Sequence, residues 1–90
     1  MRRAAKVDAN QTAIVRELRA IGVSVWILGK PLDLLICHRG ETSVMEVKNP
    51  EGKNRYTNDQ IDFMAEWPGR IYTVRSPQDA VEQVLARWMG

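Results

Sequence analysis

Two segments in the middle of the chain, residues 32–37 and 42–48, are largely apolar on both faces of any strand they form. A short polar turn, His38-Arg39-Gly40-Glu41, separates them. Strands that are apolar on both sides are typical of sheet interior covered by helices, not of a sheet that faces water. The two segments therefore predict the central hairpin of an α/β domain.

The rest of the chain supplies helices and further strands around this hairpin. Apolar residues at helical spacing before Gly22 predict a first helix, and Ser76-Pro77 predicts the cap and first turn of the last one. We expect elements in the order α-β-β-β-α-β-α, at residues 8–21, 23–28, 32–37, 42–48, 57–67, 70–74 and from 76 onward. This order predicts one α/β domain over 1–90, a mixed sheet flanked by helices, with a basic N-terminal tail at 1–7.

Composition limits the kind of site this domain can hold. The chain has 90 residues with one cysteine, Cys37, and one histidine, His38, so neither a disulfide framework nor a zinc site is expected. A metal would be held mainly by oxygen ligands, as Mg²⁺ or Mn²⁺ is. No apolar run approaches the ~20 residues of a membrane span, and no apolar segment follows the basic start. We therefore expect a cytoplasmic protein.

The predicted hairpin brings acidic residues together. If Arg39-Gly40 are the two loop residues of the turn, Asp33 lies directly across from Glu46, with Cβ atoms about 4.5–5.5 Å apart. Lys48 shares their face because side chains alternate along a strand. A slip of one residue in the pairing would separate the two acids, so the prediction depends on this register.

Two facing carboxylates on an otherwise apolar face are unfavourable as structure. Asp33 and Glu46 would repel each other and raise each other's pKa, and Lys48 offsets only one negative charge. A divalent cation between the carboxylates would resolve the imbalance. The alternative is an ordinary ion-pair cluster near a sheet edge, because a D…ExK pattern is common by chance.

Four motifs extend the pattern along nearly the whole chain: Asp8-Ala9-Asn10-Gln11, Asp33-Leu34-Leu35-Ile36, Glu46-Val47-Lys48 and Thr57-Asn58-Asp59-Gln60. In this order they resemble the PD-(D/E)XK nucleases, and most closely the stand-alone VRR-NUC (virus-type replication-repair nuclease) domains of phages and prophages. The resemblance implies a restriction-endonuclease-like fold in a bacterial or phage-infected cell. Two features depart from the family: Pro31 stands one residue earlier than usual, and Gln11 replaces a frequent glutamate.

The resemblance also implies a set of site residues. Asp33, Glu46 and the backbone carbonyl of Val47 would bind Mg²⁺ or Mn²⁺, and Lys48 would position and activate the attacking water. Gln60 and Gln11 would complete the site from the two helices. Both glutamines also fit a capping box, in which the side chain bonds the backbone of its own helix cap. The resemblance favours a site role for Gln60 and leaves Gln11 open.

These residues predict a metal-dependent, structure-selective DNA endonuclease. The net charge of +2 permits nucleic-acid binding, and Lys30, Lys53 and Arg55 are the candidate DNA contacts. The stand-alone members of the family that the chain resembles are similar to Holliday-junction resolvases. Because one site cuts one strand and a junction needs two symmetric nicks, the resemblance implies a homodimer that resolves Holliday junctions. Its interface could use tryptophans, although core packing is the simpler fate of each: Trp26, Trp67 and Trp88. The alternatives are a flap or single-strand nickase and a catalytically silent nucleic-acid-binding module.

Overall fold

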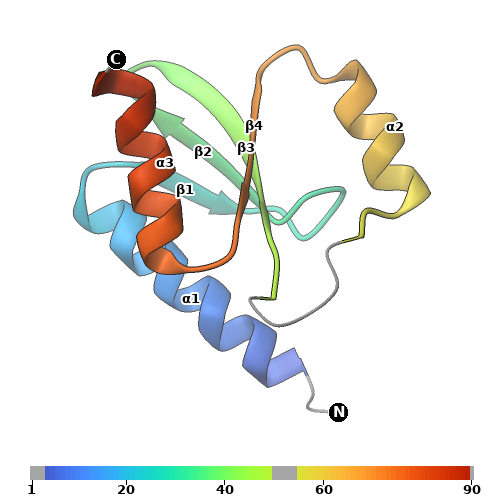
Figure 1. Ribbon diagram of the computed structural model, residues 1–90, viewed down its shortest axis with the longest axis horizontal. Helices are drawn as coiled ribbons and strands as arrows, with labels where there is room; N and C mark the ends of the chain where they lie inside the picture. Colours follow the sequence, from blue (N-terminus) through green and yellow to red (C-terminus); the bar gives the residue numbers. More distant parts are fainter. Residues whose placement is uncertain (1–3, 50–54, 90) are drawn as a thin grey trace.

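The computed structural model describes residues 4–49 and 55–89. Three helices and four strands follow one another in the predicted order (Figure 1). They are α1 (Ala4–Ala20), β1 (Ser24–Ile27), β2 (Leu34–His38), β3 (Glu41–Val47), α2 (Asn58–Glu66), β4 (Arg70–Val74) and α3 (Pro77–Met89). The predicted fold class, a small α/β domain with a mixed sheet, is confirmed.

Helix α1 begins earlier than the sequence predicted. It starts at Ala4 and not at residue 8, so the part of the supposed tail from residue 4 onward is helical. Alanine and lysine are strong helix formers, which explains why the helix continues upstream of Asp8. Its end agrees with the prediction: Gly22 has φ +92°, and Val23 N–H donates to the Leu18 carbonyl in a glycine-terminated cap.

The four strands form one sheet in the order β1-β2-β3-β4, antiparallel except for the parallel pair β3 and β4. At the central turn both Arg39 (φ +53°) and Gly40 (φ +82°) are left-handed, as a two-residue type I′ hairpin requires. His38 pairs with Glu41, which confirms the predicted register. The last pair of the ladder aligns residues 34 and 45, so Asp33 enters the sheet next to Glu46.

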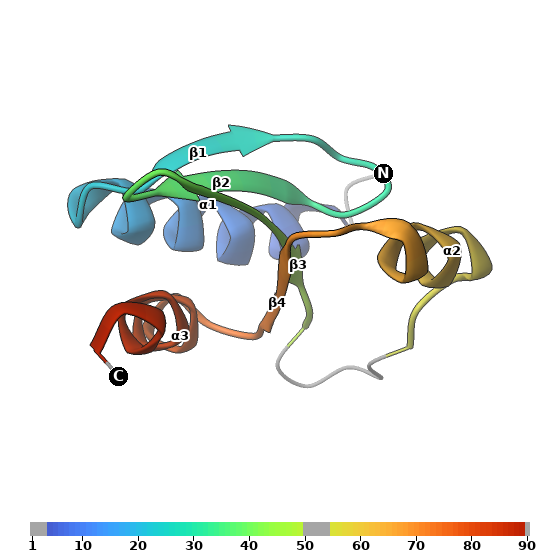
Figure 2. The ribbon, with the colours of Figure 1, turned by 90° about the horizontal axis from the view of Figure 1, so that it is seen from above.

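Helices α1 and α3 lie on the same face of the sheet, and α2 lies apart from them, beyond one end (Figure 2). The core fills the space between α1, α3 and the sheet. Its buried apolar residues are Ile14, Val15, Leu18, Val23, Val25, Leu34, Ile36, Met45, Val47, Tyr72, Val74, Ala80 and Val84. In the described part of the chain, no helix has the length and apolar character needed to cross a membrane.

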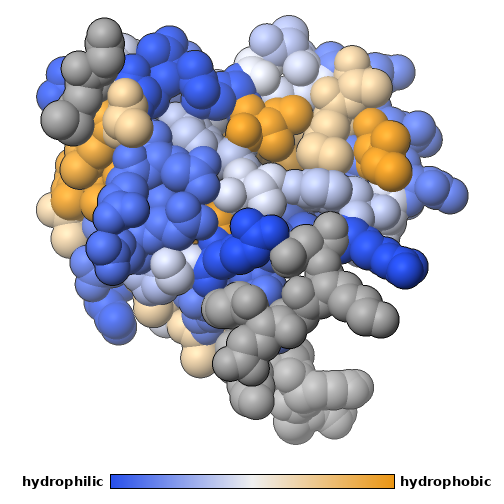
Figure 3. Space-filling view, in the orientation of Figure 1, coloured by the Kyte–Doolittle hydropathy of each residue, from blue (hydrophilic) through white to orange (hydrophobic). Residues whose placement is uncertain are grey.

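Helix α2 packs less tightly than the other two helices. None of its residues, all of which the structure describes, is buried. Figure 3 shows apolar surface over this helix. The side chain of Ile61, which belongs to α2, is 51% exposed. At its C-terminal end Trp67 stacks on Phe63 and donates from Nε1 to the Arg70 carbonyl at 3.1 Å. Contacts at its two ends therefore do most to hold α2 in place.

The three tryptophans have different environments. Trp26, on edge strand β1, is 69% exposed. Trp67 is half-buried against its own helix, and Trp88 is half-buried between the Arg87 guanidinium and the His38 ring. Packing within the domain accounts for the last two, which leaves Trp26 as the tryptophan available to a partner.

Candidate active site

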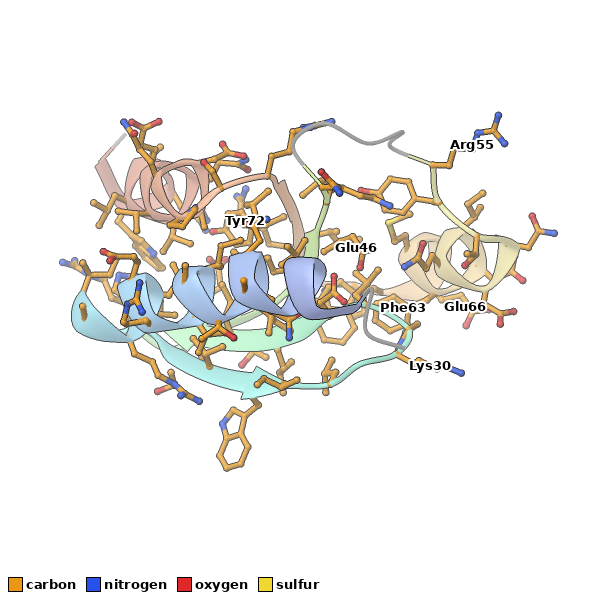
Figure 4. All side chains as sticks on the ribbon, turned by 90° about the horizontal axis from the view of Figure 1, so that it is seen from below. Lys30, Glu46, Arg55, Phe63, Glu66 and Tyr72 are labelled. Atoms are coloured by element: carbon orange, nitrogen blue, oxygen red, sulfur yellow. The ribbon has the colours of Figure 1, made fainter. Side chains whose placement is uncertain are left out.

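The end of the hairpin opposite the turn brings Asp33 and Glu46 together, as predicted. Asp33 immediately precedes β2, and its Oδ2 accepts a hydrogen bond from the backbone N–H of Val47 at 2.8 Å. This bond fixes the carboxylate across the end of β3, beyond the last backbone pair of the ladder. Figure 4 shows Glu46 at the end of the sheet that faces α2.

The same bond places the backbone of Val47. In a strand, the N–H and C=O of one residue point to the same side, because opposed residues exchange both bonds. The Val47 carbonyl therefore faces the side on which Asp33 lies. The role of Val47 as a backbone oxygen ligand requires this orientation, and it stays a prediction.

Glu46 is a buried acid in an unfavourable environment. It is 7% exposed, and burial raises the pKa of its carboxyl, with the negative charge of Asp33 raising the pKa further. The hydrogen bond from Gln60 and the charge of Lys48 lower the pKa, but the net direction is upward. Its Oε1 is buried and has no hydrogen-bond partner among the described residues. An unpaired, desolvated carboxylate oxygen is costly to leave in a fold without compensation.

Lys48 is buried beside Glu46 and makes three contacts through its ammonium group. Its Nζ lies 3.5 Å from Glu46 Oε2 and donates to the Arg55 carbonyl at 2.6 Å. It also lies 4.3 Å from the centre of the Tyr56 ring, within range of a cation–π interaction. The predicted sharing of one face by Lys48 and Glu46 is confirmed.

Gln60 combines the two roles that the sequence presented as alternatives. Its side-chain Oε1 accepts from the backbone N–H of Thr57 at 3.0 Å. The backbone N–H of Gln60 donates to Thr57 Oγ1, and the two bonds form a capping box. Its Nε2 donates to Glu46 Oε2 at 3.0 Å and to the Pro31 carbonyl at 3.1 Å. Because the cap occupies the oxygen, the amide can present only its donor side to Glu46.

Gln11 does not join this cluster. It lies well inside α1, so Asp8 is not the helix cap and the capping interpretation of Gln11 is wrong. Gln11 lines a shallow groove between α1 and β1, together with Arg16, Arg19 and Ile27. Within residues 4–49 and 55–89, no hydrogen bond connects Gln11 to the two acids or to Lys48.

The candidate DNA contacts lie around the site. Lys30 is exposed and lines an open groove with Thr57 and Gln60. The side chain of Arg55 is exposed on the other side of Glu46 in the view of Figure 4, while its carbonyl holds Lys48. Lys53 lies outside the described residues.

The donors present fit a hard divalent cation in kind. Among the described residues no three side chains of the types His, Cys, Asp and Glu gather into a metal site. The available oxygens are the carboxylates of Asp33 and Glu46 and the Val47 carbonyl, and Mg²⁺ characteristically takes one or two carboxylates and completes its shell with water and phosphate. The unpartnered Glu46 Oε1 is the observation that favours such an ion.

Two residues of this cluster were missed by the sequence analysis. The Tyr56 hydroxyl hydrogen-bonds Thr73 Oγ1 of β4, and Thr73 is the residue paired with Glu46 across the parallel ladder. The position of Tyr56 directly before the helix cap was the available signal, but a lone aromatic at a loop end has many uses. The role of Tyr56 depends on its contact with Thr73, which lies 17 residues later in the sequence.

Comparisons of the chain with protein-family models, with curated proteins and with solved structures returned no match. The resemblance to VRR-NUC domains therefore stays a prediction that rests on the quoted sequence motifs.

Proposed function

We propose that this chain is a divalent-metal-dependent endonuclease that hydrolyses phosphodiester bonds in DNA, with Asp33, Glu46 and Lys48 at its active site. The observation that carries the proposal is the buried Glu46 carboxylate, which lies beside a second acid and keeps one oxygen unpartnered among the described residues. An ion pair with Lys48 alone would leave the charge of the second acid, Asp33, without compensation. A site for Mg²⁺ or Mn²⁺ accounts for both features of this carboxylate.

Each residue has a separate task in this proposal. Asp33, Glu46 and the Val47 carbonyl would hold the cation, and the cation would supply Lewis-acid stabilisation of negative charge on the phosphate. The Lys48 ammonium contributes positive charge at the same place and can orient the attacking water. Gln60 fixes the Glu46 carboxylate by donating to Oε2, and this leaves Oε1 for the cation.

The proposed substrate is DNA recognised by shape. Lys30 and Arg55 present exposed positive charge around the site, and Lys53 lies in the adjoining segment, so these residues would contact phosphates. A domain with one site cuts one strand, and a two-fold dimer would cut two strands symmetrically, as resolution of a four-way junction requires. Exposed Trp26 is the first candidate for the dimer interface. The work would take place in the cytoplasm of a bacterial or phage-infected cell.

The test is cleavage of junction, flap and linear duplex DNA in Mg²⁺ or Mn²⁺. We expect cutting that requires the metal, and its loss by at least about 100-fold in Glu46→Gln and Lys48→Ala, since each removes a group that acts on the transition-state charge. Circular dichroism of both variants controls for folding. If Glu46→Gln cuts as fast as the parent, the assigned site is wrong.

The same experiment separates the alternatives. Preference for a flap or a single strand over a junction would identify a nickase. Metal-independent binding without cleavage in Mn²⁺ would identify a binding module. Sedimentation at micromolar concentration tests the dimer: a monomer that leaves junctions intact excludes the junction-resolving form.

A further inference from the structure

We propose that Tyr56 is a positioning residue, which ties the segment 55–57 to β4 through Thr73 and thereby sets both Lys48 and Gln60. The catalytic consequence of this arrangement rests on the function proposed above. The arrangement itself depends only on contacts between described residues.

The anchor point of this tether lies in the sheet, next to Glu46. The Tyr56 hydroxyl bonds Thr73 Oγ1, and the Thr73 carbonyl accepts from Gln83 Nε2 of α3 at 3.0 Å. Thr73 is also paired with Glu46 in the parallel ladder. The tyrosine is therefore attached to the sheet directly beside the buried acid.

The tether reaches Lys48 through two neighbouring groups. The Tyr56 ring lies 4.3 Å from Nζ, and the carbonyl of Arg55, the preceding residue, accepts from Nζ at 2.6 Å. Glu46 Oε2 is on the third side at 3.5 Å. Two of the three contacts of the ammonium group thus come from the tethered segment, so movement of this segment would displace Lys48 from Glu46.

The tether reaches Gln60 through the cap of α2. Thr57 follows Tyr56 directly, and its N–H and Oγ1 bind the side chain and backbone of Gln60. No residue of α2, described throughout, is buried, so apolar packing does little to fix this helix. The N-terminal end of α2 is therefore held mainly by polar contacts. Among them, the bond from Tyr56 to Thr73 connects this end to β4.

The geometry can be tested without any activity. Lys48 ε-methylene protons beside the Tyr56 ring are expected upfield of their usual position in the NMR spectrum. Thr73→Val removes the anchor without touching Tyr56 or Lys48, so it should move these protons, and the Gln60 side-chain amide signal, toward random-coil values. Thr42→Val, on the same face of the neighbouring strand, is the matched control and should leave both signals in place.

Cleavage gives the second measurement. Tyr56→Phe and Thr73→Val should each lower kcat about 10-fold, and the double variant should be no slower, because both changes remove one bond. Tyr56→Leu, which also removes the ring, should lower kcat up to about 100-fold. DNA affinity, measured with Ca²⁺ in place of Mg²⁺, should change less than about 3-fold. Tyr72→Phe controls for a tyrosine change in the core.

The two measurements distinguish failure of this inference from failure of the proposed function. A parent that cuts no DNA but shows the expected Thr73→Val shifts retains Tyr56 as the positioning residue and loses the nuclease assignment. Unchanged Lys48 and Gln60 signals in a folded Thr73→Val overturn the inference, whatever the protein cuts. Additive losses of kcat in the double variant would also overturn it.

Discussion

Strand β3 carries two glutamates: Glu41 is its first residue, and Glu46 is the last but one. They are five residues apart, so their side chains point to opposite faces of the sheet. Glu41 lies beside the hairpin turn, and Glu46 lies at the open end, where Asp33 enters the sheet. The same side chain on the same strand thus occurs in two different environments.

At the turn, Glu41 is fully matched by positive charge. Its Oε2 accepts from Arg87 at 3.0 Å, and Arg70 lies 4.0 Å from Oε1. The side chain is 28% exposed, so water also solvates it. Glu41 therefore has the environment of an ordinary surface ion pair, whose worth is about 0–1 kcal/mol.

At the open end, Glu46 has a second acid beside it and one lysine for the pair. Its carboxyl is desolvated, its pKa is raised, and Oε1 has no partner within the described part of the chain. The contacts of Glu46 within the fold do not offset the burial of its charge. A neutral side chain at this position would therefore increase the free energy of unfolding. The two glutamates therefore differ in how far their charge is compensated within the fold, and a divalent cation would act on Glu46 and not on Glu41.

The largest expected difference is in stabilisation by a divalent cation. A ligand that binds only the folded state, at 100 times its Kd, adds about 2.7 kcal/mol to the free energy of unfolding. In thermal unfolding, Mn²⁺ should therefore raise the Tm of the parent and of Glu41→Gln by about 10 °C or more. Glu46→Gln should lose most of this gain.

NaCl at the same ionic strength controls for a general salt effect, and EDTA added after Mn²⁺ should reverse the stabilisation. Equal stabilisation of Glu46→Gln and the parent would mean that the cation binds elsewhere, and loss of stabilisation in Glu41→Gln would mean that the turn, and not the open end, holds it.

Much of this comparison could be predicted from the sequence. The turn residues Arg39-Gly40 set the register, and the register set which carboxylate opposes Asp33; both follow from the short-range geometry of a two-residue hairpin. The ordinary environment of Glu41 was not predicted, because Arg87 is 46 residues away and reaches it only through the packing of α3.

The rest of the site depended on tertiary contacts in the same way. No local pattern indicated that Gln60 would cap its helix and bind Glu46 at once, because the two roles look exclusive until the position of α2 is known. The tether from Tyr56 to Thr73 joins two elements that no local pattern relates. Gln11 fitted a capping box by spacing, and this failed because the alanines before it extend the helix.

The pH dependence of stability gives the next largest effect. In the metal-free protein the folded-state pKa of Glu46 is raised above its ordinary value of 4.5, so the folded state holds this proton more tightly than the unfolded chain. This contribution is complete below the unfolded pKa and is lost as pH rises through the folded pKa. Relative to Glu46→Gln, the parent should therefore lose stability as the pH rises above about 4.5.

Urea unfolding in EDTA at several pH values measures this difference, and Glu41→Gln gives the matched comparison at the other end of the strand. A parent that gains stability relative to Glu46→Gln as the pH rises would show that the carboxylate is favourably paired in the absence of metal, contrary to its environment in the structure.

The smallest effect is expected from Glu41→Gln in the metal-free protein at neutral pH. The change keeps the shape and a hydrogen-bond acceptor for Arg87 but removes the charge, so it should cost about 0.2–1 kcal/mol, the usual worth of an exposed ion pair. High salt should reduce this cost further, because it screens charges that water can reach. Glu46→Gln under the same conditions should have the opposite sign and stabilise the fold, since it removes a buried charge that faces Asp33. Urea unfolding measures the free energy of unfolding of both variants, each of which loses one carboxylate. Equal losses of stability in the two variants would mean that the charge of Glu46 is as well compensated as that of Glu41.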